Sequence, residues 1–396
     1  MSDPIVIVSA ARTPMGGFQG DLASMTSPEL GAVAIRAAIE RAGLGPDKVQ
    51  EVIMGCVLPA GVGQAPARQA ALGAGLPLSA GCTTVNKVCG SGMKATMLAH
   101  DLLVAGTNDV MVAGGMESMS NAPYMLPKAR GGYRLGHGQV LDHMFFDGLE
   151  DRYSAETRGR LMGTFAEECA DHFSFTREAQ DEFAIASTER AQKAITEGRF
   201  AWEVAPVTVA GRKGDTVIEQ DEQPLKAKLD KIGSLKPAFR KDGTVTPANS
   251  SSISDGAAAL VLMRRSTADS LGLAPLATIV GHATHAREPR WFTTAPVGAM
   301  EALLAKTGWS TGDVDLWEIN EAFAVVTMAA MHEMKLPHDK VNVHGGACAL
   351  GHPIGASGAR ILVTLLGALK QYGGKRGVAS LCIGGGEATA IAVEMA

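Results

Sequence analysis

The feature that most constrains the fold is an internal repeat, because two stretches of the chain follow the same order of elements. Each copy begins with an apolar strand, at residues 4–8 and 277–280, and continues with a helix, a glycine turn and a second strand. A Ser-Gly pair, Ser91-Gly92 or Ser357-Gly358, then opens an apolar helix that leads to another strand. The offset stays near 265–270 residues. This repeated pattern predicts two similar α/β halves.

The middle of the chain has a different composition, with more charged residues and loop-like stretches. A helix is predicted over residues 176–198, where Thr176 can cap the start and Gly198 can end it. Residues 257–263 predict a strand that completes the first half. We therefore expect three parts: an N-terminal half (1–120 plus 251–274), a loop domain (121–250) and a C-terminal half (275–396).

Length and charge exclude several classes of protein. A chain of 396 residues is too long for one simple core. The net charge of −5 and the lack of a long basic run argue against nucleic acid or an anionic membrane as partner. No unbroken apolar stretch approaches 18 residues, so no membrane span is expected. The start of the chain, Met1 to Pro4, lacks a basic leader, and we expect an unprocessed, cytoplasmic protein.

Cys89 is the first candidate for chemistry among six cysteines with irregular spacing. No C-x-x-C pair occurs, and free thiols are the default state. Cys89 precedes a predicted helix, whose positive end favours a thiolate. Gly90 and Gly92 would let a substrate approach the backbone closely. The residue is either a nucleophile or an inert buried cysteine, and its own context leaves both open.

His352, Cys382 and Asn320 are the other candidates. His352 lies in a glycine-rich turn before a helix, and because the Ser91 and Ser357 helix starts are equivalent, we expect it to face Cys89. Cys382 ends a strand and enters three glycines, whose N–H groups could form an oxyanion hole, although a core cysteine is equally ordinary. Asn320 precedes a helix and could simply cap it.

Nucleotide and metal sites receive little support. The chain has no P-loop, and its glycine run has no G-x-G-x-x-G pattern that opens a helix. His282 and His285 lie three residues apart without further ligands nearby in the sequence, so no metal is expected. The one basic concentration contains Lys226, Lys228 and Lys231, and it is either a solvated surface or a landing site for phosphates.

These motifs together resemble the thiolase family over essentially the whole chain. The similar segments are Ser9–Pro14, Val85–Gly92, Gly114–Ser120, Asn320–Ala324, Gly351–Gly358 and Cys382–Gly386. The resemblance implies an α/β, duplicated thiolase fold of five αβαβα layers with an inserted loop domain. It also implies an acyltransferase of the acetyl-CoA acetyltransferase type.

The resemblance assigns roles to the candidates. Cys89 would attack a thioester and carry the acyl group, and His352 would activate Cys89 and help bind an oxyanion with a water held on Asn320. Cys382 would exchange a proton with the acetyl methyl group of the second acetyl-CoA. The N–H groups of Cys89 and Gly384 would form a second oxyanion hole.

The resemblance also implies substrates and partners. Acetyl-CoA, acetoacetyl-CoA and coenzyme A would be substrates or products, with no further cofactor. The implied coenzyme A and acyl site comprises Met162, Leu235, Phe239, Ser251, Phe292, Ala322 and Phe323, and the three lysines are our own addition to it. The segment 124–138 resembles a tetramerisation loop, so we expect a homotetramer built as a dimer of dimers.

Three positions depart from the common family pattern: Leu161, Phe292 and His344. Short-chain members often have His, Met and Asn there, so chain-length preference stays open. A 3-ketoacyl-CoA thiolase of β-oxidation would use the same residues on longer chains. A β-ketoacyl synthase typically needs two histidines, whereas this chain pairs His352 with Cys382. A non-catalytic scaffold that binds coenzyme A would not need two reactive thiols.

Overall fold

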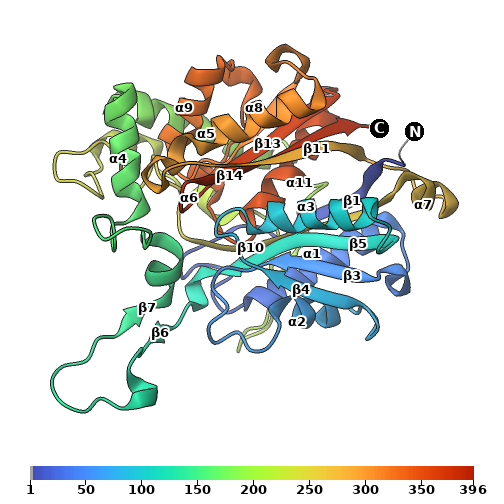
Figure 1. Cartoon of the computed structure of the whole chain (residues 1–396), viewed down its shortest axis with the longest axis horizontal. Coiled ribbons are helices and arrows are strands. Elements are labelled where there is room, and N and C mark those ends of the chain that lie inside the picture. The colour runs from blue at the N-terminus through green and yellow to red at the C-terminus, as the bar shows by residue number, and fades with distance from the viewer. Residues whose placement is uncertain (1–2) are drawn as a thin grey trace.

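The computed structural model describes residues 3–396, which form five stacked layers in the order α, β, α, β, α (Figure 1). Helices α3 (Ser91–Val104) and α11 (Ser357–Tyr372) form the middle layer. The outer layers are α1 (Ser27–Ala42) with α2 (Pro66–Gly73), and α8 (Ala295–Thr307) with α9 (Ala324–Met334). Almost every residue of α11 from Ser357 to Leu369 is buried, as a helix enclosed between two β layers must be.

The two β layers belong to one hydrogen-bonded sheet. Its strand order is β12-β13-β14-β11-β1-β10-β5-β3-β4, and β2 (Gly16–Gly17) pairs with β10. The first half contributes β1 (Ile5–Arg12), β3 (Glu51–Gly55), β4 (Gly81–Val85), β5 (Val110–Ser118) and β10 (Ser254–Arg264). The second half contributes β11 (Ala277–Ala286), β12 (Leu316–Ile319), β13 (Arg376–Ile383) and β14 (Glu387–Met395). Strands β1 and β11 join the halves through the pairs Val6–Thr278 and Ile7–Ala277.

The predicted repeat is present in the topology. In the first half β3 runs parallel to β5, and β5 runs antiparallel to β10; in the second half β12, β13 and β14 repeat these relations. The copies differ at one place, because β4 has no full counterpart beside β12. A single parallel bridge between Trp317 and Val341 takes its position. Strand β4 therefore leaves an open edge at one end of the sheet, and β12 ends the other.

The segment between the halves carries shorter elements. They are the hairpins β6 (Tyr124–Met125) with β7 (Leu141–Asp142) and β8 (Val207–Val209) with β9 (Thr216–Ile218), and helices α4 (Met162–Phe173), α5 (Arg177–Thr196) and α6 (Glu222–Lys226). Helix α5 is the one expected, and the Thr176 hydroxyl accepts a bond from the Ala179 N–H at its start. The arm closed by β6 and β7 projects from the body (Figure 1). The three-part division of the chain stays a proposal with which this arrangement is compatible.

A buried ionic contact ties this segment to β1. The Arg12 side chain is fully buried, and its guanidinium donates to Glu203 at 2.5 Å and to Asp221 at 2.6 and 2.9 Å. A buried charge that loses its partner is strongly destabilising, so this contact fixes where the inserted segment lies on the first half. Within residues 3–396, no helix has the length and apolar character needed to cross a membrane.

Candidate active site

The first turns of α3 and α11 pack against each other at the centre of the molecule. A Cβ atom added to Gly92 would lie 2.9 Å from the Ala359 nitrogen, and one added to Gly358 would overlap the Met93 backbone. Only glycine permits this approach of two backbones. The turn before α3 carries Cys89, and the turn before α11 carries His352. The close packing of the helix starts therefore brings residues from the two halves to one place, as the repeat predicted.

Hydrogen bonds hold the turn that carries Cys89. Val88 has a φ of 46°, which is costly for a β-branched residue and needs support from its surroundings. Its N–H donates to the Asn86 side chain at 2.9 Å. The Ser91 hydroxyl accepts from the Lys87 N–H at 2.8 Å and donates to the Val88 carbonyl at 2.6 Å. The turn is thus fixed at both ends, and Cys89 lines a cavity next to it.

Cys89 is a thiol, not a thiolate, when no substrate is bound. Burial raises the pKa of Cys89 to about 11, while the N–H groups of Gly384 and of Cys89 itself act in the opposite direction. The N–H groups favour a thiolate, as the helix start predicts, but burial disfavours the charged form more strongly. A base must therefore take the proton before Cys89 can attack. The two N–H groups converge on the sulfur region, where a developing negative charge could be stabilised.

His352 is set up to be that base. Its Nδ1 lies 2.6 Å from the Ser357 hydroxyl, and this hydroxyl donates its own hydrogen to the Pro353 carbonyl at 2.9 Å. Ser357 must then accept from His352, so the proton of the neutral ring sits on Nδ1. Nε2 then carries the lone pair of the ring. Burial lowers the pKa of His352 to about 3, so the imidazole is neutral and able to accept a proton.

Cys382 occupies the end of β13 and is fully buried. Burial, and then the nearby sulfur of Cys89, raise the pKa of Cys382 well above that of an ordinary thiol. The strand then turns sharply, and Gly385 and Gly386 have φ values of 96° and 85°. Cys382 is thus held protonated beside Cys89, in the state required of a general acid.

Asn320 does not cap a helix. Helix α9 begins at Ala324, and its N-cap residue is Phe323. The Asn320 side-chain nitrogen lies 3.5 Å from both ring nitrogens of His352, at the outer limit of a hydrogen bond. The buried Asn320 Oδ1 has no hydrogen-bond partner within residues 3–396. A polar group of this kind is suited to hold a water or a substrate oxygen beside His352.

A cavity of about 470 Å³ collects most of the predicted site residues. Cys89, His352 and Gly384 contribute to its lining. The other predicted residues around it are Met162, Phe239, Ser251, Phe292, Ala322 and Phe323. The Phe323 ring packs edge-on against Phe239 at 5.9 Å and against Phe292 at 6.4 Å between centroids. The Ser251 hydroxyl donates to the Ala322 carbonyl at 2.9 Å, which leaves its oxygen able to accept from a ligand.

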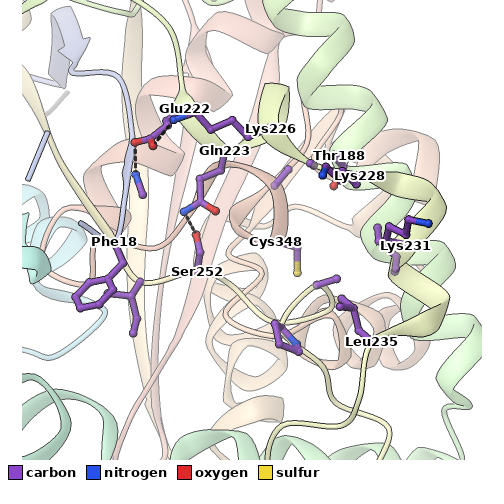
Figure 2. Close-up of a pocket in the computed structure, with 17 residues that line it drawn as sticks. Phe18, Thr188, Glu222, Gln223, Lys226, Lys228, Lys231, Leu235, Ser252 and Cys348 are labelled. Carbon is purple, nitrogen blue, oxygen red and sulfur yellow. Dashed lines mark hydrogen bonds and ion pairs between the residues drawn. The ribbon is translucent and has the colours of Figure 1, made fainter. Parts of the chain in front are cut away.

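A second cavity of about 620 Å³ contains the remaining predicted residues, Lys226, Lys228, Lys231 and Leu235 (Figure 2). It shares Gln223, Pro247, Ser252 and Ile253 with the first cavity, so the two adjoin. Lys226 is not free, because it donates to Glu222 at 2.6 Å and lies 3.6 Å from Asp21. Lys228 forms no ion pair with any residue from 3 to 396, and Lys231 lies 3.5 Å from Asp230.

Sequence reasoning gave no role to Glu117, which braces the site. Its buried carboxylate accepts from the N–H groups of Val57 at 2.9 Å, Leu58 at 3.1 Å and Gly355 at 2.8 Å. Burial raises the pKa of Glu117 to about 7. The carboxylate joins a loop of the first half to the His352 turn of the second. Glu117 and Ser357 both lie in segments that carry the family resemblance, which was the signal available.

Comparisons with known proteins agree with this geometry. Residues 5–266 match the family described as "Thiolase, N-terminal domain", and residues 273–395 match "Thiolase, C-terminal domain". Acetyl-CoA acetyltransferase 2 of Arabidopsis thaliana is 52% identical over 394 residues, covering 99% of this chain and 97% of its own length. Acetyl-CoA acetyltransferase of Cupriavidus necator is 52% identical over 392 residues, covering 98% of this chain and 99% of its own length.

The fold is also similar to that of a thiolase. The crystal structure of Acat5 thiolase from Ascaris suum in complex with coenzyme A superposes with a TM-score of 0.93. It is 43% identical in sequence and covers 99% of this chain and 100% of its own. The expected duplicated α/β fold is confirmed by this match.

The Ser357 bond to His352 generates a prediction. Replacing Ser357 with alanine removes the acceptor that holds the ring proton on Nδ1, so the tautomer with a free Nε2 loses its support. We expect Ser357→Ala to lower kcat by about 10–100-fold, the usual cost of losing a hydrogen bond that orients a reactive histidine's ring. KM for the thioester should stay nearly unchanged, as steady-state kinetics can measure.

A matched control is Ser380→Ala. Ser380 is also buried, and its hydroxyl donates to the Thr389 carbonyl at 2.9 Å without contacting His352. Thermal unfolding of both variants reports the cost of removing a buried hydroxyl. Equal kcat values for the wild type and a folded Ser357→Ala variant would contradict the assignment.

Proposed function

The chain belongs to the thiolase family, and we propose that it is an acetyl-CoA acetyltransferase that uses Cys89, His352, Cys382, Asn320 and Gly384. The enzyme transfers an acetyl group between coenzyme A thioesters and requires no cofactor beyond these substrates. The observation that carries the proposed mechanism is the single cavity where Cys89, His352 and Gly384 meet beside Cys382. The relatives that carry this name support the choice of substrate.

The first half-reaction acetylates Cys89. His352 Nε2 accepts the proton of the Cys89 thiol, and the sulfur attacks the carbonyl of acetyl-CoA. A water held on Asn320, together with the His352 ring, stabilises the negative charge on the carbonyl oxygen. The intermediate then expels the coenzyme A thiolate, which takes the proton back from His352. The products are acetyl-Cys89 and free coenzyme A.

The second half-reaction forms a carbon–carbon bond. Cys382, as a thiolate, removes a proton from the methyl group of a second acetyl-CoA, and the resulting carbanion attacks the acetyl carbonyl on Cys89. The N–H groups of Cys89 and Gly384 stabilise the oxyanion. Loss of the Cys89 thiolate releases acetoacetyl-CoA. The neutral His352 ring, which accepts the Cys382 thiol proton when that thiol ionises, returns it to Cys89, while Cys382 keeps the proton taken from the methyl group.

The raised pKa of Cys382 suits the role that this group has in the reverse direction, thiolysis. There, attack of Cys89 on the ketone of acetoacetyl-CoA releases a carbanion of acetyl-CoA, which needs a proton. A Cys382 thiol held protonated by burial supplies that proton without a preceding ionisation. In the condensation direction the same burial makes formation of the Cys382 thiolate costly.

A thiolase for longer 3-ketoacyl chains is the second candidate. The apolar wall of the cavity favours the short substrate, because Phe292 is buried and packs edge-on against both Phe165 and Phe323. Leu161 and Met162 also line the cavity. Large, well-packed side chains leave little room for an extended acyl group. A coenzyme A-binding scaffold has no use for one buried and one partly buried thiol beside a neutral histidine.

Thiolysis of a series of 3-ketoacyl-CoA esters from C4 to C16 tests the function. We expect kcat/KM to be highest for acetoacetyl-CoA and to fall by more than about tenfold once the chain gains several methylenes, because one unaccommodated methylene already costs about 1–3 kcal/mol. A 2-methyl-branched C4 ester belongs in the series, since Phe292 lines the acyl end. A rate that rises toward C16 would favour the second candidate.

Lys228 and Lys231 are proposed to attract the phosphates of coenzyme A at the mouth of the second cavity. We expect the Lys228→Ala, Lys231→Ala double variant to raise KM for coenzyme A by about two- to fivefold, the size of a solvent-exposed charge contact. Its kcat should not change, and high salt should remove the difference. Lys213, an exposed lysine that lines neither cavity, provides the control variant Lys213→Ala. An unchanged KM at low salt would contradict the assignment.

The proposed homotetramer is supported by two exposed features. Strand β4 pairs only with β3 and presents a free edge, which natural proteins usually cover. The projecting arm of β6 and β7 exposes Tyr124, Leu126, Leu135 and Val140. Light scattering should give four chains per particle, and shortening the arm should give two. A cytoplasmic location stays a prediction.

A further inference from the structure

Three potential metal ligands meet at the seam between the two halves, away from the thiols. His100 and Asp101 lie on α3, and His282 lies on β11 of the other half. The Asp101 Oδ1 atom is 3.1 Å from His100 Nδ1 and 2.8 Å from His282 Nε2. Their ligand atoms all lie within 4.8 Å of one another. Two imidazoles and one carboxylate form a donor set that zinc and its neighbours in the periodic table prefer.

The distances between these ligand atoms match those expected around a single metal ion. Zinc binds imidazole and carboxylate through bonds of about 2.0–2.2 Å, which places neighbouring ligand atoms about 3 Å apart. The two measured distances bracket that value. The ring centroids of His100 and His282 are 5.0 Å apart, and the ring planes meet at 88°. The side chains therefore need little rearrangement to coordinate a metal.

The surroundings of the group contain one unfavourable charge and one open side. Lys306 opposes the binding of a cation, because its ammonium donates to the His282 carbonyl at 3.2 Å and disfavours another positive charge nearby. Asp101 is half exposed, and this leaves an open side where water could complete the coordination shell.

A bulge in β11 helps to direct His282. The pairing of β11 with β14 shifts register between Ile279 and Gly281, and a bulge of this kind re-aims the side chains that follow it. His282 then points to α3. This group cannot be recognised from the sequence, because Asp101 and His282 are 181 residues apart along the chain.

We propose that a divalent transition-metal ion of the zinc class binds to His100, Asp101 and His282 and cross-links α3 to β11. The ion would join the N-terminal half to the C-terminal half through three protein ligands, with water completing the shell. A site of this kind is structural, because it contacts neither cavity. It should raise the thermal stability of the chain without taking part in acyl transfer.

Zinc titration with a competing colorimetric chelator tests the proposal. We expect the wild type to bind one zinc ion per chain at this site. Asp101→Asn should weaken that binding by more than about tenfold, because even the loss of a group that only supports a metal ligand costs about tenfold. His282→Gln should do the same. In each case the zinc-dependent rise in Tm should disappear.

Two controls separate this site from other zinc ligands. His285→Gln changes a histidine on the same strand that lies outside the group, and it should retain the bound zinc. Zinc also binds thiols, so Cys89→Ala tests whether the ion is bound at the active-site cysteine. This variant should retain the bound zinc as well. Loss of the bound ion in Cys89→Ala, or equal zinc binding by the wild type, Asp101→Asn and His282→Gln, would overturn the proposal. Neither result bears on acyl transfer, which has its own tests.

Discussion

The close contact between the first turns of α3 and α11 determines where the candidate reactive side chains of this site lie. Each helix begins with a Ser-Gly pair, and the glycines permit two backbones to approach more closely than any side chain would allow. The residues just before these helices, Cys89 and His352, then share one cavity although they lie in different halves. Glu117 secures the same contact, because its buried carboxylate bonds to a loop of the first half and to Gly355 of the second.

Burial has opposite effects on the two kinds of reactive group. It raises the pKa of the thiols and lowers the pKa of His352, so the resting site holds neutral groups that cost little to keep away from water. The Ser357 hydroxyl fixes the tautomer of His352, because it accepts the Nδ1 proton and leaves the lone pair on Nε2. Negative charge then develops only as the thioester reacts, at a position where the N–H groups of Cys89 and Gly384 can stabilise it.

Much of this arrangement can be predicted from the sequence where the signal is local or repeated. The Ser91 and Ser357 helix starts reveal the duplication, and Thr176 marks the start of α5 correctly. Long-range features could not be found in that way. The joining of two sheets through β1 and β11, the partners of Glu117 and the approach of Asp101 to His282 all depend on packing between distant segments. The protonation state of Cys89 could not be predicted for a related reason, since its position at a helix start is visible in a sequence whereas its depth of burial is not.

Mass-spectrometric peptide mapping of the acetyl intermediate tests the central claim most directly. The Cys382→Ser variant, incubated with acetyl-CoA, should accumulate an acetyl group on the Cys89 peptide while forming acetoacetyl-CoA orders of magnitude more slowly than the wild type. The first half-reaction does not use Cys382, whereas the second needs the proton exchange of Cys382. An acetyl group on another cysteine, or equal loss of both half-reactions in this variant, would contradict the account.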